Sequence, residues 1–184
     1  AHRWRAAGLE VLASDYRDCD AVAVAASDLV LAGSPVNYFE APGHFRDWLD
    51  ALPPLPDARC AAFATFGGPG GNAFNAAAGL LGCLARRGAL PVDLARFGNM
   101  STFAPTWSLG NEARTLAYRH LPDDGTFEAA RRFADGVLDR VGAGRGLDAA
   151  PTWNLDEVFK GAVSVQGTKW AVGGHAVDPS ACIG

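Results

Sequence analysis

The sequence predicts an α/β protein in which helices cover both faces of one parallel sheet, giving three layers. Two short stretches, 29–32 and 61–64, are apolar at every position, which is typical of parallel strands buried on both faces. A segment with helical spacing lies between them, and the strand–helix alternation continues to about residue 141. With 184 residues, of which 49% are hydrophobic, the chain fits a single domain of ordinary size and is not disordered throughout.

The first part of the chain alternates between short apolar runs and short helical patterns. A glycine after a helical pattern is a common helix end, and proline disfavours continued pairing inside a sheet. The elements predicted here are, in order, the end of a helix at 1–7 that Gly8 stops, a short strand at 9–12, a short helix at 20–26, and the buried strand at 29–32, which Gly33-Ser34-Pro35 ends.

Longer helices are predicted where apolar residues recur at positions i, i+3, i+4 and i+7. In the first of them, Phe45 and Trp48 share one face behind Pro42, which the first helical turn tolerates. Asn72 is the expected N-cap of the second. Pro91 lies inside the last predicted strand and places it at a sheet edge, because proline cannot donate to the ladder. The predicted elements are helices at 42–52, 72–87 and 126–141 and strands at 61–64 and 90–95.

Composition excludes several classes of function. The formal net charge of −4 comes without a cluster of Lys or Arg, which argues against a nucleic-acid-binding surface. No apolar run approaches the ~20 residues needed to cross a bilayer, so no membrane partner is expected. The four cysteines are far apart rather than arranged as a disulfide framework, which favours a reducing compartment and a cytoplasmic protein. The oligomeric state is left open.

Two unusual loops follow the buried strands at 29–32 and 61–64. In open parallel sheets, ligands bind beyond the carboxyl ends of the strands. The first loop offers a hydroxyl, an amide and two aromatic rings, and the second has glycines that let backbone groups approach a ligand closely. Together they suit a flat, amphipathic ligand; the alternative is that both are structural turns. The candidate ligand-binding residues are Ser34, Pro35, Val36, Asn37, Tyr38 and Phe39 in the first loop and Thr65, Phe66, Gly67 and Gly68 in the second.

The order of these motifs resembles the flavodoxin family. The resemblance rests on Asp28-Leu29-Val30-Leu31-Ala32-Gly33-Ser34-Pro35-Val36-Asn37-Tyr38, with Pro42 and a helix after it, and on Ala64-Thr65-Phe66-Gly67-Gly68. It implies a flavodoxin-like three-layer fold with strand order 2-1-3-4-5, in which these two loops hold the isoalloxazine ring of FMN. It also implies a fragment truncated at both ends that lacks the first strand and the phosphate-binding loop. The backbone of 29–32 is then expected to be unpaired on one side.

The end of the sequence resembles the entry to a bacterial-type ferredoxin domain. The resemblance rests on Val177-Asp178 and on Cys182-Ile183-Gly184, and Asn99-Met100 resembles a loop of the branch in which a flavodoxin domain precedes a ferredoxin domain. It adds Asn99 to the FMN site and implies that Cys182 ligates a 4Fe-4S cluster in the full-length chain. The implied domains are a flavodoxin-like domain at 1–142 and, at 143–184, a linker with the start of a ferredoxin-like domain.

The resemblance implies an electron-transfer flavoprotein that carries electrons between FMN and an iron–sulfur cluster and docks on redox partner proteins. No Ser-His-Asp arrangement stands out in the sequence, which fits a carrier that needs no catalytic acid or base. One alternative is an NAD(P)H-dependent flavin or quinone reductase, with the stretch 98–122 as a lid over the flavin. A second alternative is a degenerate domain without a cofactor. A cysteine directly after Gly184 in the reading frame would favour the carrier.

The remaining candidate groups have simpler interpretations. His44 is expected to be a solvated histidine at a helix start, and Cys60 and Cys83 are expected to be small buried hydrophobic residues. The acidic residues Asp15, Asp18 and Asp20 favour a solvated loop over a metal site, because no matching ligand spacing accompanies them.

Overall fold

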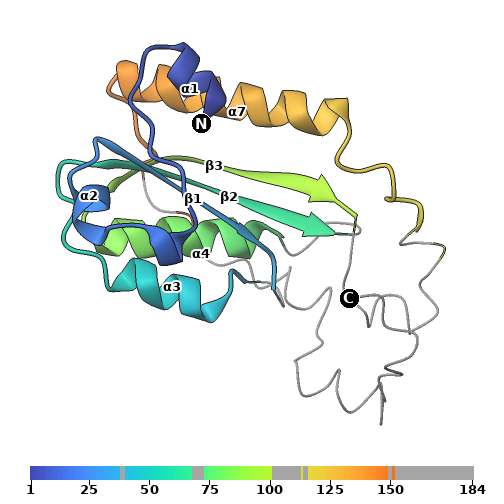
Figure 1. The fold of residues 1–184 in the computed structure, drawn as a ribbon, viewed down its shortest axis with the longest axis horizontal. Helices are drawn as coiled ribbons and strands as arrows, with labels where there is room; N and C mark the ends of the chain where they lie inside the picture. Colours follow the sequence, from blue (N-terminus) through green and yellow to red (C-terminus); the bar gives the residue numbers. More distant parts are fainter. Residues whose placement is uncertain (38–39, 68–72, 101–112, 114–115, 149–150, 152–184) are drawn as a thin grey trace, which may run out of the picture.

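The fold is seen in a computed structural model that describes residues 1–37, 40–67, 73–100, 113, 116–148 and 151. Within these residues, three parallel strands form one sheet in the spatial order β1-β2-β3. Figure 1 shows α1 and α7 on one face of the sheet and α3 and α4 on the other. The described elements are α1 (His2–Ala6), the 3-10 helix η1 (Tyr16–Asp18), α2 (Ala21–Ala25), β1 (Leu29–Pro35), α3 (Gly43–Asp50), β2 (Arg59–Gly67), α4 (Ala73–Arg86), β3 (Leu90–Asn99) and α7 (Asp124–Gly142).

The predicted α/β class, three of the four predicted parallel strands and the predicted helices are thereby confirmed for the described residues. The ends of the helices differ from the prediction by a few residues. α7 starts two residues early because Asp123 caps it: the Asp123 carboxylate accepts a hydrogen bond from the Thr126 N–H at 2.8 Å, and the Thr126 hydroxyl accepts one from the Asp123 N–H at 3.4 Å. The predicted cap of α4, Asn72, lies outside the described residues.

The predicted strand at 9–12 is wrong. Residues 9–15 have no regular secondary structure, and the side chains of Leu9 and Leu12 are exposed. Only Val11 of this run packs against the core, in the cluster that α1 and α7 form with the sheet. Apolar residues alone do not make a strand, because the backbone of a strand needs a neighbouring ladder to bond with.

The first strand is longer than predicted, because Gly33-Ser34-Pro35 continues β1 instead of ending it. The Thr65 carbonyl of β2 accepts a hydrogen bond from the Val36 N–H at 2.8 Å. The backbone groups of the even-numbered residues of β1 therefore face β2, and those of the odd-numbered residues face away from it. Pro35 therefore falls at a position that points away from the ladder, where a missing N–H removes no bond. At the start of β3, Pro91 lies in a strand at an edge of the described sheet, which confirms the predicted place of that strand.

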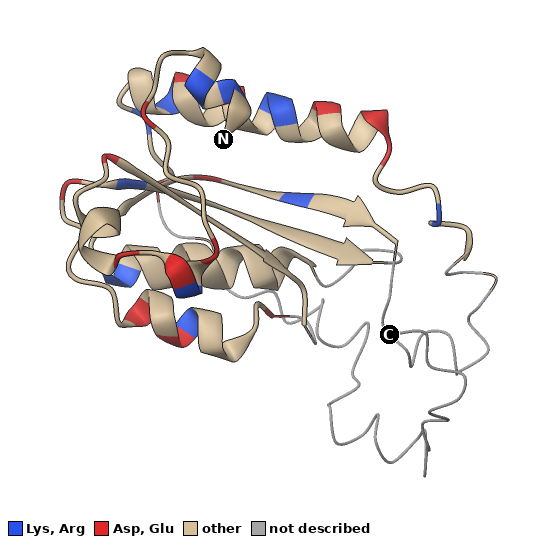
Figure 2. Cartoon of the chain, in the orientation of Figure 1, with Lys and Arg blue, Asp and Glu red and all other residues tan. Residues whose placement is uncertain are grey.

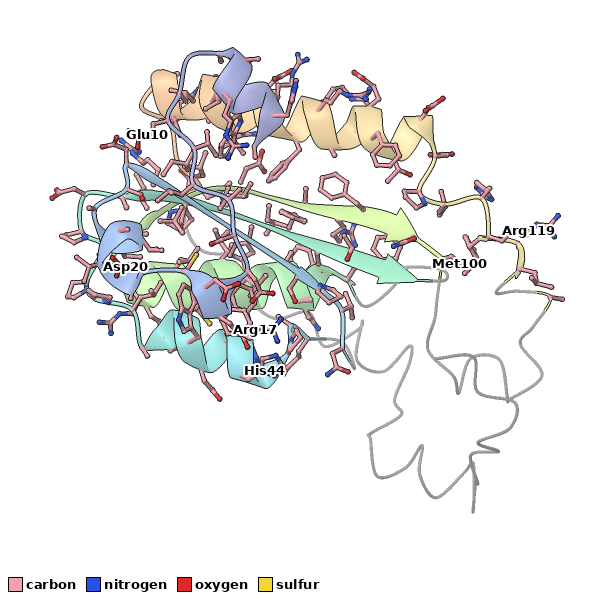
Figure 3. All side chains as sticks on the ribbon, viewed as in Figure 1. Glu10, Arg17, Asp20, His44, Met100 and Arg119 are labelled. Carbon is pink, nitrogen blue, oxygen red and sulfur yellow. The ribbon has the colours of Figure 1, made fainter. Side chains whose placement is uncertain are left out.

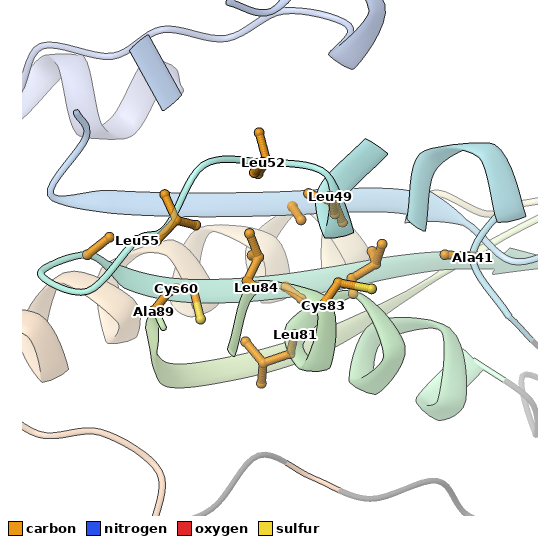
Figure 4. Close-up of a cluster of buried hydrophobic side chains, with 13 residues drawn as sticks. Ala41, Leu49, Leu52, Leu55, Cys60, Leu81, Cys83, Leu84 and Ala89 are labelled. Atoms are coloured by element: carbon orange, nitrogen blue, oxygen red, sulfur yellow. The ribbon is translucent and has the colours of Figure 1, made fainter. Parts of the chain in front are cut away.

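Two apolar layers hold the helices to the sheet. On the α3 and α4 side, leucines, alanines and both buried cysteines form the larger cluster, which Figure 4 shows. On the other side, Trp4 of α1 and Val137 of α7 pack on Ala61 and Val92 of the strands. The Trp4 indole N–H also donates to the Ala134 carbonyl at 3.0 Å, which fixes α1 on α7. No helix in the described ranges is long and apolar enough to span a membrane.

Candidate functional site

The carboxyl ends of the three described strands meet at one edge of the sheet (Figure 1). The register pairs Pro35 with Thr65 and Gly67 with Asn99, so the ends of β1, β2 and β3 lie side by side. The described candidate residues therefore come together as the sequence predicts. What each of them offers to a ligand depends on the bonds it already makes.

At the end of β1, the buried polar side chain of Ser34 already makes a hydrogen bond within the protein. Ser34 is 5% exposed, and its hydroxyl donates to the Pro35 carbonyl at 2.8 Å. The Val36 N–H belongs to the ladder with β2, and the Val36 side chain packs on the cluster between the sheet and α4. Pro35 and Asn37 are exposed. The backbone N–H and carbonyl of Asn37 both bond to Glu40, so the available group at this strand end is the side-chain amide of Asn37.

At the end of β2, the exposure rises from Thr65 to Gly67, which lies at the surface. The half-buried Phe66 lies beside Gly98 of β3, and a Cβ added to Gly98 would sit 3.8 Å from the Phe66 ring and 3.0 Å from a methyl carbon of Leu121. The absence of a side chain at Gly98 thus lets Leu121 approach the sheet closely, whereas the distance to Phe66 is an ordinary contact. Because Gly67 is exposed, its backbone groups can be reached from solvent.

At the end of β3, Asn99 is exposed and its amide oxygen accepts a hydrogen bond from the Met100 N–H at 2.7 Å. Figure 3 labels Met100 where the chain leaves the sheet. The amide nitrogen of Asn99 is the group of this side chain that can donate to a ligand. Four candidate residues lie outside the described residues, so their roles stay predictions: Tyr38, Phe39, Gly68 and Cys182.

The described candidate residues form a surface without charge. Figure 2 shows that charged side chains lie mainly on the helices and loops, while the strands are almost free of them. Polar but neutral groups combined with accessible backbone suit a neutral, hydrogen-bonding ring system better than an isolated anion. Among the described residues, no group of three or more His, Cys, Asp or Glu side chains is placed to hold a metal ion.

In the segment before β1, η1 packs on the first turns of α3 through aromatic rings. The Tyr16 ring lies 4.9 Å from the Phe45 ring, 5.6 Å from the Trp48 ring and 5.9 Å from the His44 ring, measured between centroids. His44 itself is exposed at the start of α3, as the sequence predicts, and Figure 3 labels it together with Arg17 of η1. The aromatic contacts explain how the loop before β1 is held on α3.

Two of the acidic residues before β1, Asp15 and Asp20, serve as helix caps. The Asp15 carboxylate accepts a hydrogen bond from the Arg17 N–H at 3.0 Å and binds the Arg17 guanidinium at 2.9 Å, and these bonds lower the Asp15 pKa to about 2. Asp20 accepts a hydrogen bond from the Val22 N–H at 2.9 Å and caps α2. The physical role of both carboxylates is thus to satisfy free N–H groups at helix starts.

A cavity of about 330 Å³ lies between α3 and α4 and shares no residue with the strand ends. Of the four charged side chains that line it, three are in ion pairs: Arg86 binds Asp50 at 2.8 Å, and Arg46 binds Glu40 outside the lining at 2.7 Å, while Asp47 is exposed. Its thiol, Cys83, is 1% exposed, and burial raises the Cys83 pKa, which keeps the thiol protonated. We therefore place the candidate site at the strand ends and not in this cavity.

The sequence did not reveal the ion pair between Glu40 and Arg46, although it lies next to the first candidate loop. A carboxylate just before a helix and an arginine in its first turn are six positions apart, which is no helical spacing. The two side chains meet only because the folded chain brings Glu40 close to Arg46. The contact of Leu121 with Gly98 was missed for the same reason, since the two residues are distant in sequence.

Comparisons of this chain with known protein families, with curated proteins and with solved structures find no match.

Proposed function

We propose that the chain is an electron-transfer flavoprotein that binds the isoalloxazine ring of FMN at the carboxyl edge of its sheet. The observation that carries the proposal is the register of the three strand ends, which pairs Pro35 with Thr65 and Gly67 with Asn99. The register supports the proposal because both candidate loops start at the edge where Asn99 also lies, in the order of the flavodoxin-like motifs. A further strand beside β1, at the place of the first strand in the flavodoxin-like order, is part of this proposal.

The described groups suit the ring system. The pyrimidine side of isoalloxazine presents both N–H donors and C=O acceptors in one plane. Exposed backbone at Gly67 and the amides of Asn37 and Asn99 supply both kinds of partner without charge. Phe66 and Leu121 make the neighbouring surface apolar, which excludes water from the ring. None of the described strand-end residues from Ser34 to Asn37, from Thr65 to Gly67 or at Asn99 is cationic, so the phosphate is not assigned to them.

Bound FMN supplies the electron-transfer chemistry, and the chain's own residues bind, orient and shield the ring. The 4Fe-4S cluster, with Cys182 as one ligand, belongs to the same proposal for a longer chain, as do redox partner proteins that dock near the strand ends. A reductase would place NAD(P)H over the same ring. Rapid NAD(P)H oxidation by the FMN-loaded protein would favour that alternative over the carrier.

The test is titration of the full chain with FMN, followed by the quenching of flavin fluorescence. Gly67→Val puts a branched side chain where the ring edge approaches the backbone. Losing one or more hydrogen bonds there raises the Kd about tenfold or more. Gly142→Val is the matched control, since Gly142 lies at the end of α7 and a Cβ there meets nothing within 4 Å.

Two results would refute the proposal. One is a wild-type chain that does not bind FMN. The other is a Gly67→Val variant that is folded and binds FMN with the same Kd as the Gly142→Val control, which would mean that the ring lies elsewhere.

A further inference from the structure

The turn that follows β1 is closed by its own backbone. The Asn37 N–H donates to the Glu40 carbonyl at 2.7 Å, and the Glu40 N–H donates to the Asn37 carbonyl at 3.2 Å. This pair of bonds returns the chain toward α3. Ala41, directly after the turn, is 2% exposed and packs in the core beneath α3. The turn is therefore tied down at its far end, while Asn37 at its start is exposed.

One side-chain contact joins this turn to a helix. The Arg46 guanidinium binds the Glu40 carboxylate at 2.7 Å, with side chains that are 35% and 30% exposed. Because this pair is partly buried, water and salt screen it less than they screen the other ion pairs of α3 and α7, whose arginines are more exposed. α3 is itself fixed by Leu49, which is 1% exposed. Glu40 is thus anchored through Arg46 to a rigid element.

We propose that the ion pair between Glu40 and Arg46 positions Asn37 at the ligand site, through the two backbone hydrogen bonds that join Asn37 to Glu40. Glu40 and Arg46 are positioning residues that act through the turn and do not touch the ligand. With the pair intact, Asn37 is held in one place before FMN binds, and less ordering free energy is lost on binding. The inference rests on the proposed FMN site.

The simpler alternative is a pair that only adds to the stability of α3. These two roles differ in what they change. A purely stabilising pair lowers the unfolding midpoint when broken but leaves the turn and the FMN Kd as they were. A positioning pair loosens the turn in the folded apo protein and weakens FMN binding, even far below the unfolding midpoint.

The experiment compares Glu40→Gln with Asp50→Asn in the full chain. Asp50→Asn breaks the other ion pair of α3, with Arg86, and is the matched control. We measure hydrogen exchange at the Asn37 and Glu40 amides without flavin, and the Kd for FMN by fluorescence quenching. Glu40→Gln is expected to speed exchange at both amides and to raise the Kd about threefold to tenfold, which is the cost of ordering one or two side chains. Asp50→Asn is expected to change neither.

A charge swap provides the rescue. Glu40→Arg combined with Arg46→Glu restores an ion pair at the same place and is expected to return amide exchange toward wild type. Unchanged exchange at both amides in Glu40→Gln overturns the inference, whether or not FMN binds. If the wild-type chain does not bind FMN, the proposed function fails, and the exchange measurement still decides whether the pair fixes the turn.

Discussion

Replacing Gly33 with alanine tests how the sheet is packed next to the candidate site. A Cβ on Gly33 would lie less than 3.0 Å from three carbons of the Phe63 ring, closer than real side chains come. The ring cannot swing freely, because its centroid is 5.8 Å from that of Phe97, which in turn lies 6.0 Å from Phe133 of α7. The Gly33→Ala variant must therefore displace a ring that is held on its other side.

Overpacking of this kind costs about 1–3 kcal/mol of unfolding free energy. For a chain of this length, each kcal/mol lowers the Tm by about 2–4 °C. Urea denaturation followed by circular dichroism measures the change. Gly79→Ala is the matched control: Gly79 lies within α4, a Cβ there meets nothing within 4 Å, and alanine is expected to stabilise the helix by about 0.5–1 kcal/mol. The same substitution thus has opposite signs at the two positions.

A double-mutant cycle shows whether the Phe63 ring is the cause. Phe63→Leu destabilises on its own, because contacts with Phe97 are lost. In its background, Gly33→Ala is expected to cost less than in the wild type by about 0.5–3 kcal/mol, since the obstructing ring is gone. The reasoning is refuted if Gly33→Ala is as stable as wild type, or if its cost is the same with and without Phe63.

Three further outcomes are expected. Trp4→Phe removes the indole N–H that donates to the Ala134 carbonyl and lowers the unfolding free energy by about 0.5–1.5 kcal/mol, measured by urea denaturation. The hydrogen bonds that Asp123 accepts from Thr126 lower the Asp123 pKa below its ordinary value of 3.8. The Asp123 carboxylate therefore stabilises the fold fully above that pH, and this stabilisation is lost as the pH falls through the lowered pKa. The Tm difference between wild type and Asp123→Ala should accordingly shrink in acid. Burial raises the pKa of Cys60 to about 12, and peptide mapping after thiol labelling at mildly alkaline pH should find Cys60 and Cys83 modified only on unfolding.

The sequence predicts the buried strands well because few structures satisfy their pattern. A short run that is apolar at every position must be covered on both faces, and a strand between two helical layers meets that requirement. Helix spacing is equally clear in α4, where nine of the residues are buried. The ends of elements depend on finer features. The cap at Asp123 and the outward position of Pro35 are set by hydrogen bonds that a pattern of apolar residues does not contain.

For the candidate site, the sequence predicts which residues lie close together, but it does not predict which of their atoms are free to bind a ligand. Parallel strands bring their carboxyl ends together, so Asn37, Gly67 and Asn99 follow from the topology alone. Ser34 was expected to offer a hydroxyl, yet that hydroxyl is bound to the neighbouring carbonyl. The ion pair of Glu40 was missed because its partner is brought close only by the turn. Side-chain orientation and long-range pairing are consequences of folding that residue types do not reveal.

The two edges of the described sheet differ, and the difference accounts for the failed prediction at 9–12. At the β3 edge, the Leu147 N–H donates to the Pro91 carbonyl at 2.8 Å and covers the start of the strand. At the β1 edge, the outward-facing backbone groups of Leu29 and Leu31 find no backbone partner within the described ranges. Such groups cost about 1–3 kcal/mol each when buried unpaired, so they require water or another strand. Residues 9–15 make no ladder with them, and without a ladder an apolar run remains a loop whatever its pattern.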